Sequence, residues 1–130
     1  MKIIDGKGAV LGRLASNVAK EALGGEEIAI LNCEEIIITG GKVSIKKDYL
    51  RKRNMVGHSQ KGPKHARASE KMVKRAIRGM LPNFRWGRGR EAWKRIKCYT
   101  GIPKEFEGKK IETIKMQKKN KFSKVKDFSR

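Results

Sequence analysis

The sequence predicts an α/β fold that begins with a parallel strand–helix–strand unit. Residues 2–5 (KIID) have the apolar character of a short strand, which ends at Gly6. Between Leu11 and Ala22, apolar side chains recur at three- and four-residue intervals and therefore share one face of a helix. Ile28–Leu31 are continuously apolar, which is typical of a strand covered on both faces. Two short strands joined by a helical crossover pair in parallel.

The next residues predict a short strand-like piece and a second helix. Gly24 and Gly25 end the first helix, because glycine adopts the left-handed conformation at low cost. Ile36–Thr39 follows the second strand too closely for a parallel crossover, which takes about a dozen residues or more. We therefore expect a bent continuation of that strand or a short edge piece. Helical spacing over Val43–Arg53 predicts a helix with a basic outer face, whose inward side chains are Ile45, Tyr49 and Leu50.

A long basic loop and a third helix are predicted in the middle of the chain. Residues 54–68 (NMVGHSQKGPKHARA) show no apolar periodicity, so they predict a loop, and its length favours a functional role. Helical spacing returns from Met72 to Met80. Ser69 is a candidate N-cap for this helix, and Pro82 is expected to end it.

The last part of the chain predicts a short helix over residues 90–96 and a strand over 97–99. Residues 117–130 combine low hydrophobicity with high charge, so we expect an extended basic tail that is poorly ordered by itself. A chain of 130 residues can bury one modest core. The organisation expected is therefore a single domain over residues 1–130, with the basic loop at 54–68 and the basic tail at 117–130.

Charge is segregated along the chain. Lys and Arg number 33 against 13 Asp and Glu, for a formal net charge of +20 and a pI near 10.4. Residues 1–41 carry a net charge of −2, residues 42–97 carry 19 basic and three acidic side chains, and residues 115–130 carry a net charge of +6. Blocks as asymmetric as these mark interaction surfaces. The partner expected is a polyanion, which would relieve the self-repulsion of the cations.

Catalytic, metal-binding and membrane functions find little support in the sequence. His58 and His65 lie in the basic loop, and two histidines among lysines do not supply the converging donors of a metal site. Cys33 and Cys98 have neither CxxC nor CxxxH spacing, so we expect small core residues. There is no apolar run of 18 residues, and the start lacks the apolar core of a secretory signal, so a soluble intracellular protein is expected. We predict neither an enzyme nor a cofactor.

One motif leaves a nucleotide-dependent enzyme open as an alternative. Gly6, Gly8 and Gly12 follow a strand and open a helix, as in the dinucleotide fingerprint, but their GxGxxxG spacing is one residue too long. A tight strand-to-helix turn explains the same glycines. We therefore favour the turn over a cofactor site.

The residue types of the basic half point to RNA. Arginine binds phosphate through two hydrogen bonds and stacks on bases, and glycine lets the backbone approach a sugar-phosphate chain. Trp86 and Trp93 offer flat faces for stacking, although Trp93 on its predicted helix also suits the core. We see no zinc finger, leucine zipper, helix-turn-helix, RRM or KH signature. A free-standing binder that tolerates many nucleic-acid sequences remains a second alternative.

The predicted RNA contacts form two sets. The first lies at the end of the basic helix and in the loop and comprises Arg51, Lys52, Arg53, His58, Lys61, Lys64, His65 and Arg67. The second lies in the following basic block and comprises Arg75, Arg78, Arg85, Trp86, Arg88, Arg90 and Lys94.

Six blocks of sequence, in the same order along the chain, carry a resemblance to a known family. They are IIDGKGAVLGRLAS, IAILNCEEIIITG, KDYLRKR, GPKHARAS, RGMLP and KCYTGIP. With these blocks the chain resembles the universal ribosomal large-subunit protein thirteen family. GPKHARAS is similar to the archaeal and eukaryotic branch, and the end at Arg130 without a long basic extension favours the archaeal type.

The resemblance implies a small, mainly parallel sheet between helices, in three α/β/α layers. It implies a structural constituent of the large ribosomal subunit in the cytoplasm, which binds large-subunit (23S-type) rRNA and helps subunit assembly. Neighbouring ribosomal proteins are the other partners expected; catalysis, cofactors, small-molecule substrates, membranes and homo-oligomers are not. Trp86 stands where such proteins usually have no indole, so its role is left open.

Overall fold

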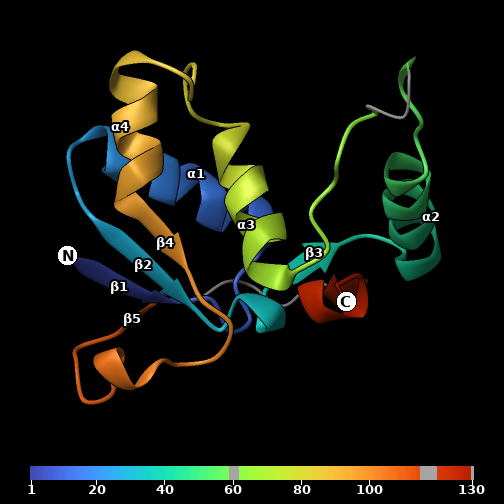
Figure 1. Cartoon of the computed structure of the whole chain (residues 1–130). Coiled ribbons are helices and arrows are strands. Elements are labelled where there is room, and N and C mark those ends of the chain that lie inside the picture. Colours follow the sequence, from blue (N-terminus) through green and yellow to red (C-terminus); the bar gives the residue numbers. More distant parts are fainter. Residues whose placement is uncertain (59–61, 115–119, 130) are drawn as a thin grey trace.

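The computed structural model describes residues 1–58, 62–114 and 120–129 (Figure 1). Its main sheet has four parallel strands in the order β4-β2-β1-β5. They are β1 (Lys2–Asp5), β2 (Ile28–Leu31), β4 (Ile96–Cys98) and β5 (Glu112–Thr113). The prediction of an α/β fold with a mainly parallel sheet is confirmed.

Three helices cover one face of this sheet. They are α1 (Leu11–Leu23), α3 (Ser69–Arg78) and α4 (Gly87–Arg95), and their apolar faces pack with Ile4, Ile28 and Ile30 in one core. The chain steps from β1 to β2 and on to β4 in one direction across the sheet. Right-handed crossovers in a constant direction place their helices on the same face.

The opposite face has a thinner cover. The connection from β4 to β5 runs back across the sheet, so the same rule of handedness sends it beneath the other face. There Phe106, on the 3₁₀-helix η3 (Lys104–Phe106), packs with Ile3, Ala29 and Leu31. The third layer expected from the resemblance is therefore a 3₁₀-helix with its flanking loop rather than an α-helix.

The C-terminal segment is folded onto the domain in its described part, so the expectation of a poorly ordered tail is wrong for residues 120–129. Strand β6 (Phe122–Lys124) pairs antiparallel with β3 (Ile37–Thr39), which makes a separate two-stranded sheet and resolves β3 as an edge piece. Val125 and Phe128 then enter the core. The segment docks because β3 offers an unpaired strand edge and because Val125 and Phe128 supply two apolar side chains for the core. Residues 117–119 and 130 lie outside the described residues.

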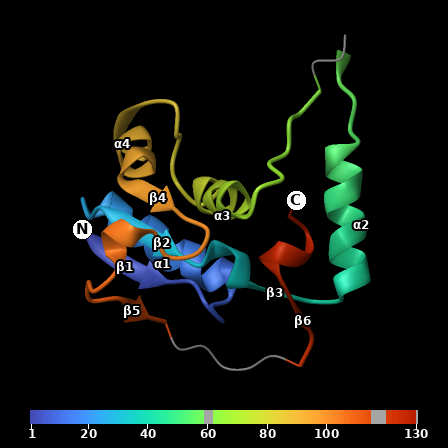
Figure 2. The same ribbon diagram turned by 60° about the horizontal axis from the view of Figure 1, so that its bottom comes forward.

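Helix α2 (Lys42–Arg53) stands apart from the rest of the domain, beside the C-terminal segment (Figure 2). None of its residues is buried, and Ile45 and Tyr49 are half-buried against the core, as predicted. Leu50 was also expected to point inward, but its side chain is 44% exposed. The helix contacts the domain along a narrow stripe that includes Ile45 and Tyr49 but not Leu50.

Two helix boundaries differ from the sequence prediction. Helix α3 begins at Ser69 with Ala68 as N-cap, and it ends at Arg78, before Pro82, so Met80 lies outside it and is 46% exposed. Helix α4 begins at Gly87, three residues earlier than expected. Its Gly89 packs closely against the backbone of residues 82–83, because an added Cβ there would lie 2.5 Å from the carbonyl oxygens of both Pro82 and Asn83.

Candidate nucleic-acid interface

The outer face of α3 carries cations that no acid among the described residues neutralises. Lys71, Lys74, Arg75 and Arg78 all lie on this helix, whose opposite side buries Met72, Val73 and Ile77. Ion pairs between described residues use other cations, namely Lys2, Lys42, Arg51, Arg95, Lys124 and Lys126. The one acid of α3, Glu70, accepts a hydrogen bond from Thr100. The charge of α3 is therefore available to an external anion.

Neutral groups hold three of these four cations in place. Arg75 Nη1 donates to the carbonyl oxygen of Lys64 at 3.3 Å. The guanidinium of Arg78 lies 4.5 Å from the ring centroid of Phe84. The ammonium of Lys74 lies 4.7 Å from the ring centroid of Trp93. These contacts orient the side chains without cancelling their charge.

Residues 64–66 run beside α3 and divide its surroundings into two hollows. The α3–α4 hollow, of about 350 Å³, is lined by Lys64, His65, Ala66, Lys71, Lys74, Arg75, Arg78 and Trp93. The α2–α3 hollow, of about 390 Å³, is lined by Tyr49, Lys52, His65, Ala66, Met72, Arg75, Ala76 and Gly79. Helix α3 lies between α2 and α4 in both ribbon views (Figures 1 and 2). The end of the predicted loop thus joins three helices into one basic surface.

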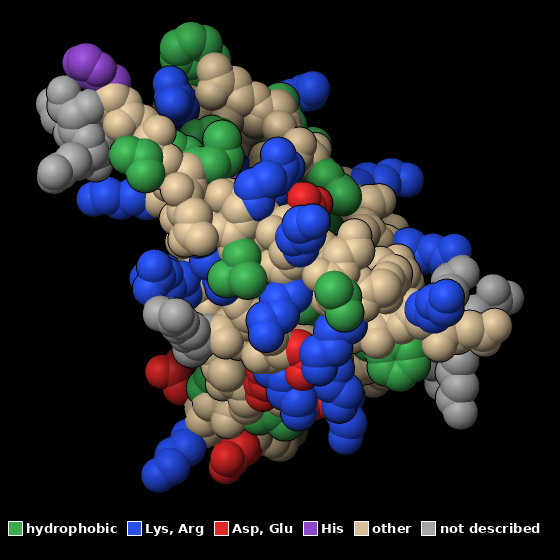
Figure 3. All heavy atoms as spheres, turned by 90° about the vertical axis from the view of Figure 1, so that its right-hand side faces the viewer, with side chains coloured by type: hydrophobic (Ala, Val, Ile, Leu, Met, Phe, Trp, Pro, Cys, Tyr) green, Lys and Arg blue, Asp and Glu red, His purple; other side chains and the backbone are tan. Residues whose placement is uncertain are grey.

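The face that carries α2 is rich in exposed Lys and Arg side chains, while acidic side chains lie mostly in its lower half (Figure 3). Lys46, Lys47 and Lys52 are exposed residues of α2. Arg51 is also exposed and pairs with Asp48 at 3.4 Å, but an exposed pair such as this contributes little. This helix therefore extends the cationic surface beyond α3.

His65 contributes a hydrogen-bonding ring rather than a charge. Burial lowers the pKa of its imidazole, and the nearby charges of Arg75, Lys52 and Arg53 lower the pKa further. A lowered pKa keeps the ring neutral at pH 7. In this form one ring nitrogen donates a hydrogen bond and the other accepts one.

Arg53 has a structural role that the sequence prediction did not foresee. Its Nη2 donates to the carbonyl oxygen of Phe128 at 2.6 Å and lies 3.8 Å from Met72 Sδ. Its guanidinium is 5.7 Å from the centroid of the Tyr49 ring. Arg53 therefore ties α2 to the C-terminal segment, and we leave it out of the proposed interface.

The other predicted contacts are spread over the surface. Arg85, Trp86, Arg88, Arg90 and Lys94 are exposed at the start and along the outer side of α4, and Trp86 is 70% exposed. His58 is exposed near the end of the first described segment, and Arg67 is exposed beside α2. Lys61 lies outside the described residues.

Three residues of this surface were missed or left open. Lys71 and Lys74 share the outer face of α3 with the predicted Arg75 and Arg78, and Trp93, which the sequence left open between stacking and the core, lines the α3–α4 hollow. Lys74 and Arg75 each lie three or four residues from both Lys71 and Arg78, a spacing that indicates one helix face. That spacing could have identified the two lysines.

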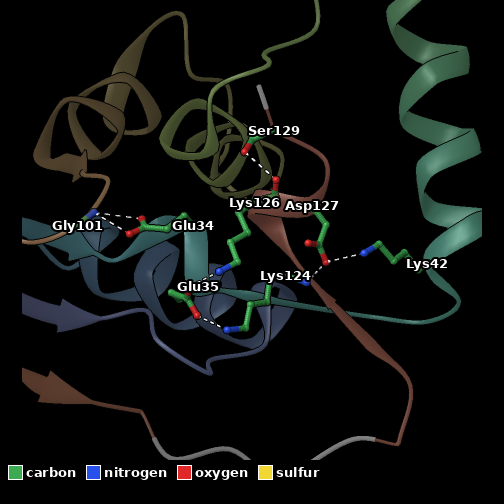
Figure 4. Close-up of polar contacts among 8 residues, drawn as sticks. All are labelled: Glu34, Glu35, Lys42, Gly101, Lys124, Lys126, Asp127 and Ser129. Atoms are coloured by element: carbon green, nitrogen blue, oxygen red, sulfur yellow. Dashed lines mark hydrogen bonds and ion pairs between the residues drawn. The ribbon is translucent and has the colours of Figure 1, made fainter.

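Two acids that follow β2 are engaged by other parts of the chain: Glu34 by the backbone after β4, and Glu35 by the C-terminal segment. Figure 4 shows Glu35 bridging Lys124 and Lys126; Lys126 Nζ lies 2.8 Å from its Oε1. These two lysines lower the pKa of Glu35 to about 2. Glu34 accepts hydrogen bonds from the backbone N–H of Gly101 at 3.0 and 3.1 Å. These carboxylates are already engaged and are not a free acidic site.

The glycine turn before α1 does not leave its amides free for a phosphate. The N–H of Gly6 donates to Leu31 O at 2.9 Å, that of Gly8 to Glu35 O at 3.2 Å, and that of Ala9 to Gly6 O at 3.0 Å. A Cβ at Gly6 would lie 2.8 Å from the side chain of Ile36. Close packing therefore explains this glycine, and the nucleotide-enzyme alternative loses its main support.

Within residues 1–58, 62–114 and 120–129, no group of three or more His, Cys, Asp or Glu residues could hold a metal ion. No helix in the same residues is long and apolar enough to cross a membrane.

The fold and this surface define a basic α/β protein suited to a large polyanion. The family model described as ribosomal protein L13 matches residues 1–105. The chain belongs to this family. Large ribosomal subunit protein uL13 of Methanococcoides burtonii is 42% identical to it, over 100% of this chain and 96% of that protein. The protein of the same name from Methanocaldococcus jannaschii is 49% identical, over 82% and 79% of the two chains. These archaeal relatives confirm the resemblance to the archaeal type of the family.

Proposed function

We propose that the chain is a structural constituent of the large ribosomal subunit that binds large-subunit rRNA and helps the subunit to assemble. It acts in the cytoplasm, with neighbouring ribosomal proteins as further partners. Its binding surface comprises the outer face of α3, residues 62–68 and the exposed cations of α2 and α4. The observation that carries the proposal is the set of α3 cations that have no acidic partner in the described part of the chain, which belongs to the ribosomal protein L13 family.

The shape of this surface suits a folded RNA. Helix α2 projects from the domain, and two hollows separate it from α3 and α3 from α4. RNA is recognised largely through its shape, its phosphates and its unpaired bases. Cations spread over three helices can reach phosphates of separate RNA segments, which is the geometry an assembly protein requires.

Salt dependence tests the surface directly. Each phosphate contact that is lost lowers the slope of log affinity against log salt by about 0.7 to 0.9. Replacing Lys71 and Lys74 together by alanine should therefore lower the slope for a large-subunit rRNA fragment by about 1.5. Replacing Lys104 and Lys110, two exposed lysines near η3, is the matched control and should leave the slope unchanged. Equal slopes for both double variants would contradict this placement.

Two comparisons separate the proposal from its alternative. Affinity for generic duplex DNA equal to that for ribosomal RNA would favour a free-standing, sequence-tolerant binder. Co-sedimentation of the native protein with large subunits through a high-salt gradient would support the structural role.

A further inference from the structure

We propose that the α3–α4 hollow binds one unpaired nucleotide of an RNA, with the base stacked on Trp93 and the adjoining phosphates on the surrounding cations. This inference rests on the proposed function. In this proposal, the α3–α4 hollow recognises an extruded base, and the remaining cations of the surface contact phosphates.

The lining of the hollow matches the two parts of a nucleotide. Three separate segments form it: residues 64–66, helix α3 and helix α4. Five of its eight lining residues are Lys or Arg, and none is acidic. Its aromatic component, Trp93, is half-buried, so part of the indole is accessible. A volume of about 350 Å³ is within the range of sites that hold small ligands.

The present contact of Lys74 indicates how the base would enter. Its ammonium lies 4.7 Å from the centroid of the indole ring, which marks a π-face that attracts an electron-poor partner. Stacking of a base on an aromatic side chain raises affinity by about fivefold to 150-fold, more than an exposed cation–π contact does. The flexible side chain of Lys74 can then move from the ring to a neighbouring phosphate. The base would take the place of the ammonium, and no charge would be left buried.

An unpaired nucleotide fits this site better than a paired one. In an RNA duplex the bases are stacked on each other, and side chains do not reach their faces; unpaired bases can be splayed out onto aromatic rings. Trp86 is more exposed than Trp93, but it lines neither hollow. Trp93 is therefore the indole that combines a stacking face with phosphate-binding groups.

A single-tryptophan protein reports on the site. The variant Trp86→Phe keeps only Trp93, because the chain has two tryptophans. The ligands are two RNA hairpins of identical sequence, except that one carries a single bulged adenosine. We expect saturable quenching of Trp93 fluorescence by the bulged hairpin, at least fivefold tighter binding of that hairpin, and little quenching by the paired one. Equal affinity and equal quenching for both hairpins would overturn the inference.

A second variant removes the stacking face. Trp93→Leu should bind both hairpins with the affinity that the parent protein shows for the paired hairpin, and Trp93→Phe should keep part of the preference. Thermal unfolding of each variant identifies any loss of folding, and the quenching measurement on Trp86→Phe needs no change at the site.

Failure of this inference can be distinguished from failure of the proposed function. Salt-dependent binding of both hairpins, without preference for the bulge, would refute the nucleotide site and leave rRNA binding intact. A protein that binds neither hairpin nor a large-subunit rRNA fragment would refute the proposed function and this inference with it.

Discussion

Phe128 holds the C-terminal segment and α2 in place, and its removal should release the segment locally. The side chain is 4% exposed and belongs to the main core. Its ring stacks on Tyr49 with centroids 5.6 Å apart and planes inclined by 20°. Its carbonyl oxygen accepts the hydrogen bond from Arg53 at 2.6 Å. Phe128 therefore contributes both a ring and a carbonyl oxygen to the attachment of helix α2, which has no buried residue of its own.

The magnitude follows from burial. Replacing a buried phenylalanine by alanine costs about 3–5 kcal/mol, of which the paired ring accounts for about 0.5–1.5 kcal/mol. The segment is near the end of the described chain, so the cost should appear as easier local opening rather than as global unfolding. Phe128→Ala should lower the opening free energy of the segment by about 3–5 kcal/mol, a factor of roughly 100 to several thousand in amide exchange rate.

Hydrogen exchange at one amide measures this opening. The N–H of Val125 donates to Ile36 O at 2.9 Å, so it exchanges only when the segment leaves β3. Phe122→Ala is the matched control, because Phe122 is 48% exposed in the same segment and its loss should cost less than about 1 kcal/mol. If the two variants accelerated the exchange of Val125 equally, the reasoning from burial would be refuted.

Two further predictions concern pH and close packing. Glu35 has a folded-state pKa of about 2, below its usual 4.5. Its ion pairs therefore stabilise the fold fully above about pH 4.5, and this stabilisation is lost as the pH falls toward 2. In acid unfolding curves, Glu35→Gln should remove this part of the pH dependence of stability. Gly89→Ala would bring a Cβ against the carbonyl oxygens of Pro82 and Asn83 and should destabilise the domain by about 1–3 kcal/mol in denaturant unfolding. Gly12→Ala, with open space around its Cβ, is the control and should be neutral or stabilising by up to about 1 kcal/mol.

The pattern of the sequence predicted the first half of the fold well because the relevant information is local. The apolar positions of α1 lie three and four residues apart, and Leu14, Ala15, Val18, Ala19 and Ala22 are all buried. The continuous apolar run of β2 is buried at every position. In both elements, the pattern of apolar residues along the sequence therefore predicts which side chains are buried.

The cysteines show a limit of reasoning from spacing. Cys33 and Cys98 were expected as separate small core residues, and Cys33 is buried as expected. The neighbouring thiol of Cys98, together with burial, raises the pKa of the Cys33 thiol. Parallel pairing of β2 with β4, which aligns Ile30 with Cys98, brings the two thiols together. No local spacing reports such a contact.

By itself, the sequence determined the parallel strand–helix–strand unit, the segregation of positive charge and the polyanionic class of partner, since these depend on residue type and short-range periodicity. Tertiary structure decided the docking of the C-terminal segment on β3, the structural role of Arg53 and the hollow in front of Trp93. Each of these brings together groups from distant parts of the chain, such as Arg53 with Phe128 or Lys74 with Trp93. Such contacts depend on how the elements pack, because burial and charge compensation are properties of the assembled surface rather than of any one segment.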